Sequence, residues 1–242
     1  KISLKNWFYM RINNSSNKIK AVLLCGGKGE RLYPLTDKTP KPLVKIKDKP
    51  ILSYIIDHLV KYSITDLIIL TGYKPNKIES YISENYAKSN IQIIDSGDVD
   101  IIKRIQDALY FIDDDFLLLY GDTISNINID NLMQFHRLSD HEVTMSVWPL
   151  ISQFGIVEID NKGTVLGFKE KPKLDKWINI GYFYFNHSVF DMIKENSSFA
   201  KLLENFASQG MLGAYKDEGI HITVNTVKEL SEAEKNISNI YS

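Results

Sequence analysis

The stretch AVLLCGGKGERLYPLT, residues 21–36, joins an apolar run to a bend that contains three glycines, a lysine and an arginine. The run from Ile19 to Cys25 is too short for an ordinary helix, and its continuous apolar character predicts a strand buried on both faces. A glycine-rich bend after the first strand lies where open α/β sheets bind ligands. The stretch therefore predicts both an α/β fold and the place of its site.

The segments that follow alternate between helical and strand patterns. Helices are expected at 50–62, 75–88 and 98–112, and buried strands at 66–71, 91–95 and 116–120. Three strand–helix–strand units in succession predict a Rossmann-like, doubly wound, mostly parallel mixed sheet.

The second half has a different pattern, richer in strands. Residues 154–172 read as a hairpin that turns at 161–163. Further strands are expected at 141–148, 178–186, 211–216 and 219–224, and helices at 187–195, 198–208 and 226–237.

Length and composition limit the number of domains and the classes of partner. The 242 residues suffice for one large domain, which we expect over 19–242, and the polar residues 1–18 read as an N-terminal extension or linker. A net charge of −1 gives no general attraction for nucleic acid or membrane surfaces. The lone Cys25 rules out an intrachain disulfide. No apolar run approaches the roughly 20 residues of a membrane span, so we expect a cytoplasmic protein.

The glycine bend has the chemistry of a polyphosphate cradle. Glycines let backbone N–H groups approach an anion, and Lys28, Arg31 and Lys41 add positive charge. In the alternative interpretation, the glycines only permit positive φ in a tight loop. GGKGERL lacks the Gly-Lys-Ser/Thr end of a P-loop, and Leu32 stands where a dinucleotide fingerprint needs its third glycine. The cradle is therefore of another kind.

Residues 21–52 closely resemble the signature of the sugar-1-phosphate nucleotidyltransferases, G-G-x-G-x-R-L-x-P-L-T followed by P-K-P. The similarity continues through LYGD, FGIVEID, FKEKPK and INIGYFYF and covers about residues 19–236. FKEKPK and GIHITVNT are most similar to the glucose-1-phosphate cytidylyltransferases. The resemblance implies a GT-A-like fold with the hairpin in a small sugar-binding half. It also implies an Mg²⁺-dependent reaction between an NTP and a sugar 1-phosphate, and it allows a homo-oligomer.

Within that resemblance, Arg31, Lys41 and Asp122 are the implied catalytic residues. The first two would stabilise charge on the α-phosphoryl group and the departing pyrophosphate, and Asp122 would hold Mg²⁺ at the end of the fourth strand. Alternatively, Asp122 caps a helix in a connecting turn. The implied nucleotide-binding residues are Leu24, Gly26, Gly27, Gly29, Glu30, Arg31, Lys41 and Gly121.

The second metal ligand of the family is acidic, and the matching position here is Asn225. An asparagine oxygen can coordinate Mg²⁺ but brings no charge. Asn225 is also a good N-cap for the final helix, although Lys228 stands where a capping box would have Glu or Gln; both roles can coexist.

For the sugar, the resemblance implies that Glu170 holds hydroxyl groups and Lys171 holds the phosphate. The implied substrate-binding set is Gly155, Glu170, Lys171, Asn179 and Gly181. The alternatives are a solvated charge run and glycines that relieve crowding in strands. The second glycine-rich segment of the family, which surrounds the nucleobase, is reduced to Gly97, and Arg104 is expected to compensate by contacting a ligand phosphate.

Two other functions stay open. A glycosyltransferase would need a D-x-D motif after the fourth strand, whereas residues 113–115 precede that strand. A non-catalytic homologue that binds nucleotide-sugars would explain Asn225 and the reduced base-binding segment. CTP with glucose 1-phosphate is the preferred substrate pair, and UTP, dTTP and GTP remain open.

Overall fold

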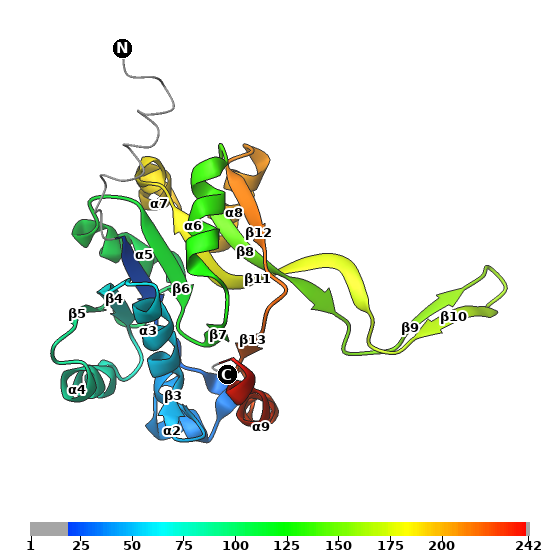
Figure 1. Cartoon of the computed structure of the whole chain (residues 1–242), viewed down its shortest axis with the longest axis horizontal. Coiled ribbons are helices and arrows are strands. Elements are labelled where there is room, and N and C mark those ends of the chain that lie inside the picture. Colours follow the sequence, from blue (N-terminus) through cyan, green and yellow to red (C-terminus); the bar gives the residue numbers. More distant parts are fainter. Residues whose placement is uncertain (1–18, 241–242) are drawn as a thin grey trace, which may run out of the picture.

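A seven-stranded mixed sheet forms the centre of the molecule in this computed structural model, which describes residues 19–240. The extension predicted for residues 1–18 lies outside the described residues. Strand order in the sheet is β12-β8-β11-β6-β1-β4-β5 (Figure 1). The strands are β1 (Lys20–Leu24), β4 (Asp66–Thr71), β5 (Asn90–Asp95), β6 (Phe116–Tyr120), β8 (Val143–Ile151), β11 (Lys173–Phe185) and β12 (Leu212–Lys216).

Strand direction confirms the predicted mixed, mostly parallel sheet. β1 pairs in parallel with β4 and β6, β4 with β5, and β8 with β12. Within this sheet, β11 runs antiparallel to both of its neighbours, β6 and β8.

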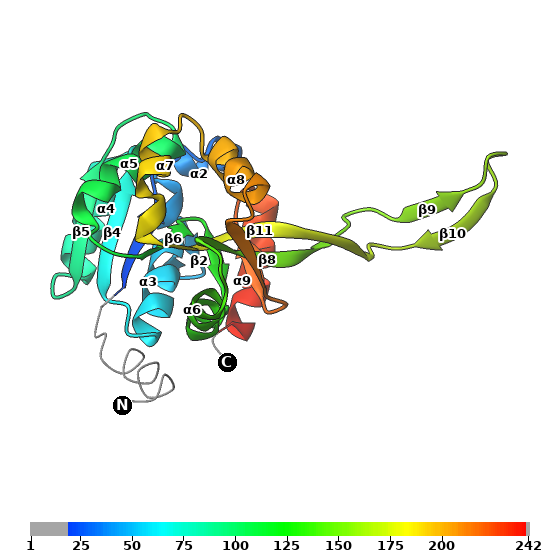
Figure 2. The same ribbon diagram turned by 90° about the horizontal axis from the view of Figure 1, so that it is seen from above.

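Helices cover both faces of the sheet, as Figure 2 shows from above. Side chains of α3, α4, α6 and α9 join the core on one face, and those of α5, α7 and α8 join the core on the other. Successive β1 residues alternate between these cores: Ala21 and Leu23 face one, and Val22 faces the other. The helices are α2 (Leu35–Lys38), α3 (Ile51–Lys61), α4 (Pro75–Asn85), α5 (Ile101–Ala108), α6 (Ile129–Leu138), α7 (Phe190–Glu195), α8 (Phe199–Ser208) and α9 (Val227–Asn236).

Helix α6 is the one long element that the sequence pattern did not predict. Its buried residues are Ile129, Leu132 and His136, which have helical spacing but include a histidine. The apolar stripe is therefore incomplete, although Asn128 caps the helix by accepting a hydrogen bond from the Asn131 N–H at 2.9 Å.

A two-stranded arm projects from the body of the protein. The extended ends of β8 and β11 lead into the hairpin of β9 (Ile156–Ile159) and β10 (Val165–Lys169), which lies well away from the helices (Figures 1 and 2). The predicted turn is confirmed at Gly163, where φ is +84°. We call residues 152–172 the arm.

The ends of β1 and β6 determine where the site lies. These strands are parallel neighbours, and Leu24 is opposite Tyr120. The glycine bend that follows β1 and the Gly121–Asp122 turn that follows β6 therefore meet at the same edge of the sheet. Among residues 19–240, no helix is long and apolar enough to cross a membrane.

Candidate active site

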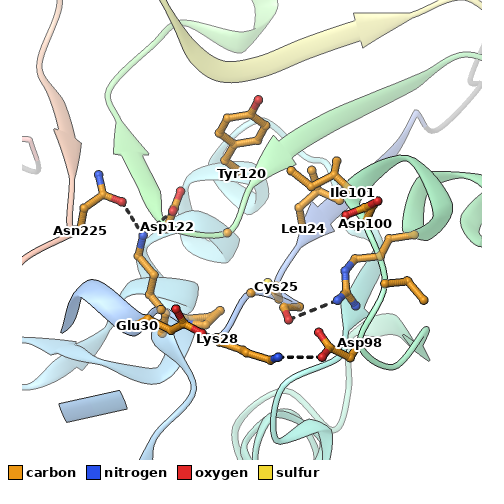
Figure 3. Close-up of a pocket in the computed structure, with 18 of the residues that line it drawn as sticks. Leu24, Cys25, Lys28, Glu30, Asp98, Asp100, Ile101, Tyr120, Asp122 and Asn225 are labelled. Carbon is orange, nitrogen blue, oxygen red and sulfur yellow. Dashed lines mark hydrogen bonds and ion pairs between the residues drawn. The ribbon is translucent and has the colours of Figure 1, made fainter. Parts of the chain in front are cut away.

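A cavity of about 620 Å³ opens at this edge of the sheet (Figure 3). The glycine bend forms one wall, Lys41 and Asp122 lie at another, and residues 98–101 close the side next to β5. At Gly27 the backbone is exposed, and a Cβ there would meet nothing within 4 Å, so this part of the bend faces open space. The cavity can therefore bring exposed backbone N–H groups and cationic side chains to one ligand.

Arg104 on α5 supports the glycine bend from below. Its guanidinium donates hydrogen bonds to the carbonyl oxygens of Thr71 and, at 3.4 Å, Gly26, and the side chain is buried. A Cβ at Gly26 would lie 2.3 Å from Arg104 Cζ, so any larger residue there would have to displace the buried guanidinium. Arg104 also lines the cavity, and its expected contact with a ligand phosphate stays a prediction.

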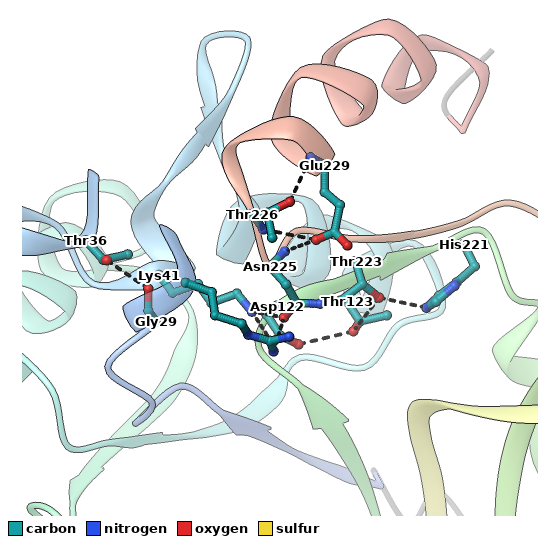
Figure 4. Close-up of polar contacts among 11 residues, drawn as sticks. Gly29, Thr36, Lys41, Asp122, Thr123, His221, Thr223, Asn225, Thr226 and Glu229 are labelled. Atoms are coloured by element: carbon teal, nitrogen blue, oxygen red, sulfur yellow. Dashed lines mark hydrogen bonds and ion pairs between the residues drawn. The ribbon is translucent and has the colours of Figure 1, made fainter. Parts of the chain in front are cut away.

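Four polar side chains converge beside the bend (Figure 4). Lys41 donates to Asp122 Oδ2 at 2.5 Å and to Asn225 Oδ1 at 2.9 Å. Arg31 donates to the same Asn225 oxygen at 3.1 Å. Lys41 is only 9% exposed, so solvent screens its pairing with Asp122 weakly. The cluster combines two cations with one carboxylate and one neutral amide.

Asn225 is oriented by the start of helix α9. The N-cap of that helix is Thr226, and the sequence-based expectation of Asn225 as the cap is wrong by one residue. Glu229 completes the capping box, and its carboxylate accepts hydrogen bonds from the N–H groups of Asn225 at 2.6 Å and Thr226 at 3.0 Å. The acidic residue of the capping box, which the sequence lacks at Lys228, is therefore Glu229, one position later. Because Thr226 caps the helix, the Asn225 side chain is left to contact Lys41 and Arg31.

Gly121 allows the two turns to approach each other. Its N–H donates to Leu24 O at 3.0 Å, and a Cβ there would lie 2.6 Å from Cys25 Sγ. Asp122 follows in the turn before β7 (Thr123–Ser125), so it does not cap α6, whose N-cap is Asn128.

Burial, and secondarily the charge of Asp122, raises the pKa of the Cys25 thiol well above its usual range. A buried protonated thiol is a poor nucleophile.

Two of the predicted sugar-binding residues border the cavity through Tyr120. The Asn179 amide donates to the Tyr120 hydroxyl at 3.3 Å and accepts from the Gly181 N–H at 2.7 Å. Gly181 has φ +76°, and a Cβ there would lie 2.4 Å from the Tyr120 ring. Since Tyr120 lines the cavity, Asn179 and Gly181 lie just behind its wall.

The other three predicted sugar-binding residues lie on the arm. Gly155 and Glu170 are close neighbours there, because a Cβ at Gly155 would lie 3.1 Å from Glu170 Oε2. Neither they nor Lys171 line the cavity in the structure. The structure therefore brings Asn179 and Gly181 close to the predicted nucleotide-binding residues, and it leaves the three residues on the arm apart from them.

Sequence reasoning named only Gly97 and Arg104 in the segment 97–104, and it did not predict the wall formed by Asp98, Val99, Asp100 and Ile101. Asp98 pairs with Lys28 at 2.7 Å across the mouth of the cavity (Figure 3). Its place after a strand could have identified it, because this segment follows β5, and the end of β5 lies at the same edge of the sheet as the glycine bend.

Comparison with known proteins identifies the family. Residues 20–237 match the family model described as nucleotidyl transferase. The chain belongs to the nucleotidyl transferase family. It is 33% identical to a probable glucose-1-phosphate cytidylyltransferase of Bacillus subtilis (strain 168), over 90% of this chain and 95% of the relative. It is 32% identical to the glucose-1-phosphate cytidylyltransferase of Salmonella typhimurium, over 87% and 93% of the two chains.

A solved structure confirms the fold of this nucleotidyltransferase. A Bacillus anthracis protein, provisionally described as a glucose-1-phosphate thymidylyltransferase, superposes with a TM-score of 0.73. The match covers 90% of this chain and 94% of the other at 22% identity, so it bears on the fold alone. The family match confirms the nucleotidyltransferase expected from the sequence signature.

Proposed function

We propose that this nucleotidyltransferase joins CTP and glucose 1-phosphate to form CDP-glucose and pyrophosphate. The observation that carries the proposal is the convergence of Arg31, Lys41, Asp122 and Asn225 beside an exposed glycine bend. The preference for CTP and glucose is supported by the two cytidylyltransferases at 32–33% identity.

The proposed step is direct displacement. An oxygen of the sugar 1-phosphate attacks the α-phosphorus of the nucleotide, the α–β phosphoanhydride bond breaks, and pyrophosphate leaves with that electron pair. Because both substrates are polyanions, the main contribution of the protein is to align them and to offset their charge. Backbone N–H groups of Gly26, Gly27 and Gly29 would hold phosphate oxygens, and Arg31 and Lys41 would stabilise the charge that develops. With Cys25 buried and protonated, no covalent intermediate on that thiol is needed.

The residues beside the bend are suited to a Mg²⁺ ion. Asp122 Oδ2 and Asn225 Oδ1 already share one cation, the Lys41 ammonium, at 2.5 and 2.9 Å. Mg²⁺ prefers oxygen ligands and is usually bound by one or two carboxylates plus phosphate oxygens. In the described part of the chain, no group of three or more His, Cys, Asp or Glu side chains could hold a metal by itself. We infer that phosphate oxygens of the nucleotide complete the site, where the ion would neutralise phosphate charge.

The sugar 1-phosphate as a whole is assigned to Asn179, Gly181, Glu170 and Lys171, with Gly155 beside Glu170. Glu170 would hold sugar hydroxyl groups and Lys171 the phosphate. Asn179 and Gly181 are near the cavity through Tyr120. For Glu170 and Lys171 to act, the arm must bend toward its own cavity or a second copy in a homo-oligomer must supply its arm.

The test is a screen of CTP, UTP, dTTP, GTP and ATP against several sugar 1-phosphates, with pyrophosphate release as the readout. We expect the highest kcat/KM for CTP with glucose 1-phosphate. Transfer of sugar from a nucleotide-sugar to an acceptor, without pyrophosphate, would instead indicate a glycosyltransferase. Nucleotide binding with no pyrophosphate release from any pair would indicate a non-catalytic homologue.

A further inference from the structure

A chain of three hydrogen bonds leads from Asp122 away from the cavity, on the side opposite Lys41 (Figure 4). Thr123 Oγ1 donates to Asp122 Oδ1 at 3.2 Å, and it lies 3.4 Å from Thr223 Oγ1. Thr223 Oγ1 in turn lies 2.9 Å from His221 Nε2. The two oxygens of Asp122 are thus held from different sides, Oδ1 by this chain and Oδ2 by Lys41.

The backbone fixes the geometry of this chain. Thr123 is in β7, and His221 and Thr223 are in β13 (His221–Thr223), which pairs antiparallel with β7. Thr223 is directly opposite Thr123 in the register of this small sheet. The pairing therefore joins the turn that contains Asp122 to the segment that precedes Asn225. It fixes the backbone next to both residues that contact the cation position.

Counting protons gives the chain a single direction. A hydroxyl group has one hydrogen to donate, and a carboxylate can only accept. Since Thr123 donates to Asp122, it must accept from Thr223. Thr223 has then used its hydrogen and must accept from His221, so His221 carries a proton on Nε2. Every donor in the hydrogen-bonded series therefore points toward Asp122, whose carboxylate can only accept.

The surroundings of His221 partly shield the hydrogen-bonded series from solvent: Thr123 is buried, and Thr223 and His221 are half-buried. The Trp148 ring lies 5.8 Å from the imidazole between centroids, and its Nε1 donates to Gly219 O at 2.9 Å. Thr123 is 2% exposed. Burial lowers the pKa of His221, while the charge of Asp122 opposes that shift. A neutral imidazole with its proton on Nε2 satisfies the chain.

We infer that Thr123, Thr223 and His221 are positioning residues that hold Asp122 so that Oδ2 faces the cation position. This inference rests on the proposed function, in which Asp122 holds the metal. Residues that orient metal-ligating side chains typically affect metal affinity or activity by about 10- to 100-fold when they are replaced. Through these hydrogen bonds, Thr123, Thr223 and His221 orient the carboxylate of Asp122.

The test compares Thr223→Val, which removes the hydroxyl at nearly constant shape, with Thr223→Ser, which keeps it. Thr144→Val is the matched control, because Thr144 is also a strand threonine bonded to a histidine, His136 Nδ1 at 2.8 Å, but it is fully buried and near the opposite end of the sheet. We expect Thr223→Val to lower kcat by about 10-fold or more, with KM for the sugar phosphate within about two-fold. Thr223→Ser should restore most of the loss, and Thr144→Val should retain wild-type kcat. Thermal unfolding of each variant shows whether it is folded.

A second readout needs no substrate. Nitrogen-15 NMR of the histidine side chains distinguishes the two neutral tautomers, and we expect His221 protonated on Nε2 in the wild type. A proton on Nδ1 instead, or equal kcat in Thr223→Val and Thr144→Val, would overturn the inference. If the wild type released no pyrophosphate, the proposed function would fail, and the tautomer would still decide whether the chain has this direction.

Discussion

Lys41 Nζ lies 2.5 Å from Asp122 Oδ2 and 2.9 Å from Asn225 Oδ1, so its ammonium group is placed between two oxygens from segments far apart in the chain. Asp122 follows β6, and Asn225 precedes α9. A metal ion that binds both oxygens must compete with this ammonium group or displace it. The cluster therefore links metal binding to the position of Lys41.

Asn225→Asp should bind Mg²⁺ more tightly, because a second carboxylate adds the charge that the amide lacks. We expect the Mg²⁺ concentration that half-saturates pyrophosphate release to fall by about tenfold, which corresponds to about 1.4 kcal/mol of added attraction. Calorimetric titration of the protein with Mg²⁺ and nucleotide checks the same change. Asn128→Asp is the control, since Asn and Asp are equivalent as N-caps and Asn128 caps α6. Half-saturation that does not change in Asn225→Asp would show that Asn225 is not a ligand.

Arg31→Ala should lower kcat by about 10² or more if the guanidinium stabilises charge in the transition state. Arg31 donates to Asn225 Oδ1 at 3.1 Å, which points its guanidinium toward the cation position. Steady-state pyrophosphate release at saturating substrates measures the change. Arg137→Ala, at an exposed position on α6, is the control and should retain wild-type turnover. Wild-type kcat in Arg31→Ala would remove Arg31 from the mechanism.

Gly26→Ala and Gly27→Ala should affect stability differently. At Gly26 the new Cβ would lie 2.3 Å from the buried Arg104 guanidinium, whereas at Gly27 it would meet nothing within 4 Å. We expect Gly26→Ala to lower the free energy of unfolding by about 1–3 kcal/mol and Gly27→Ala to change it by less than about 0.5 kcal/mol. Thermal unfolding of the two variants makes the comparison. Equal midpoints would mean that Arg104 can move aside without cost.

Lys171→Ala should raise KM for the sugar 1-phosphate by about tenfold and leave KM for the nucleotide nearly unchanged, if the arm brings this lysine to the sugar phosphate. Lys162→Ala, at the far turn of the same hairpin, is the control. Mixing inactive Asp122→Ala with Lys171→Ala then separates two routes: recovered activity means that a second copy supplies the arm. No change in KM for Lys171→Ala would contradict the predicted role.

Cys25 should be unreactive toward thiol reagents in the folded protein. Burial raises the pKa of its thiol far above the ordinary value, and the neighbouring charge of Asp122 acts in the same direction. Because the chain has one cysteine, the reaction of the whole protein reports on this thiol alone. We expect no labelling near pH 8 in buffer and one thiol per chain in guanidinium chloride. Rapid labelling of the folded protein, slowed by nucleotide, would show that the thiol faces the ligand.

Local patterns were enough to predict most of the elements around the site. The apolar run of β1, the helical spacing in α3 and the hairpin turn at Gly163 each report burial or backbone conformation within a few residues. Helix α6 was missed because His136 occupies one of its three buried positions. The cap of α9 was misplaced by one residue because Asn225 and Thr226 are both acceptable N-caps, and only the contacts of Glu229 distinguish them.

By itself, the sequence determined the family, the α/β sheet and the glycine bend with its cations, because these depend on neighbouring residues along the chain. Only the tertiary structure decided that Lys41 bridges Asp122 and Asn225, that Arg104 supports the bend and that the arm carries Glu170 and Lys171 away from the cavity. The physical reason is that those relationships join segments far apart in the chain. They are set by strand order, by side-chain packing across the sheet edge and by the direction in which β8 and β11 leave the sheet, none of which has a local sequence signal.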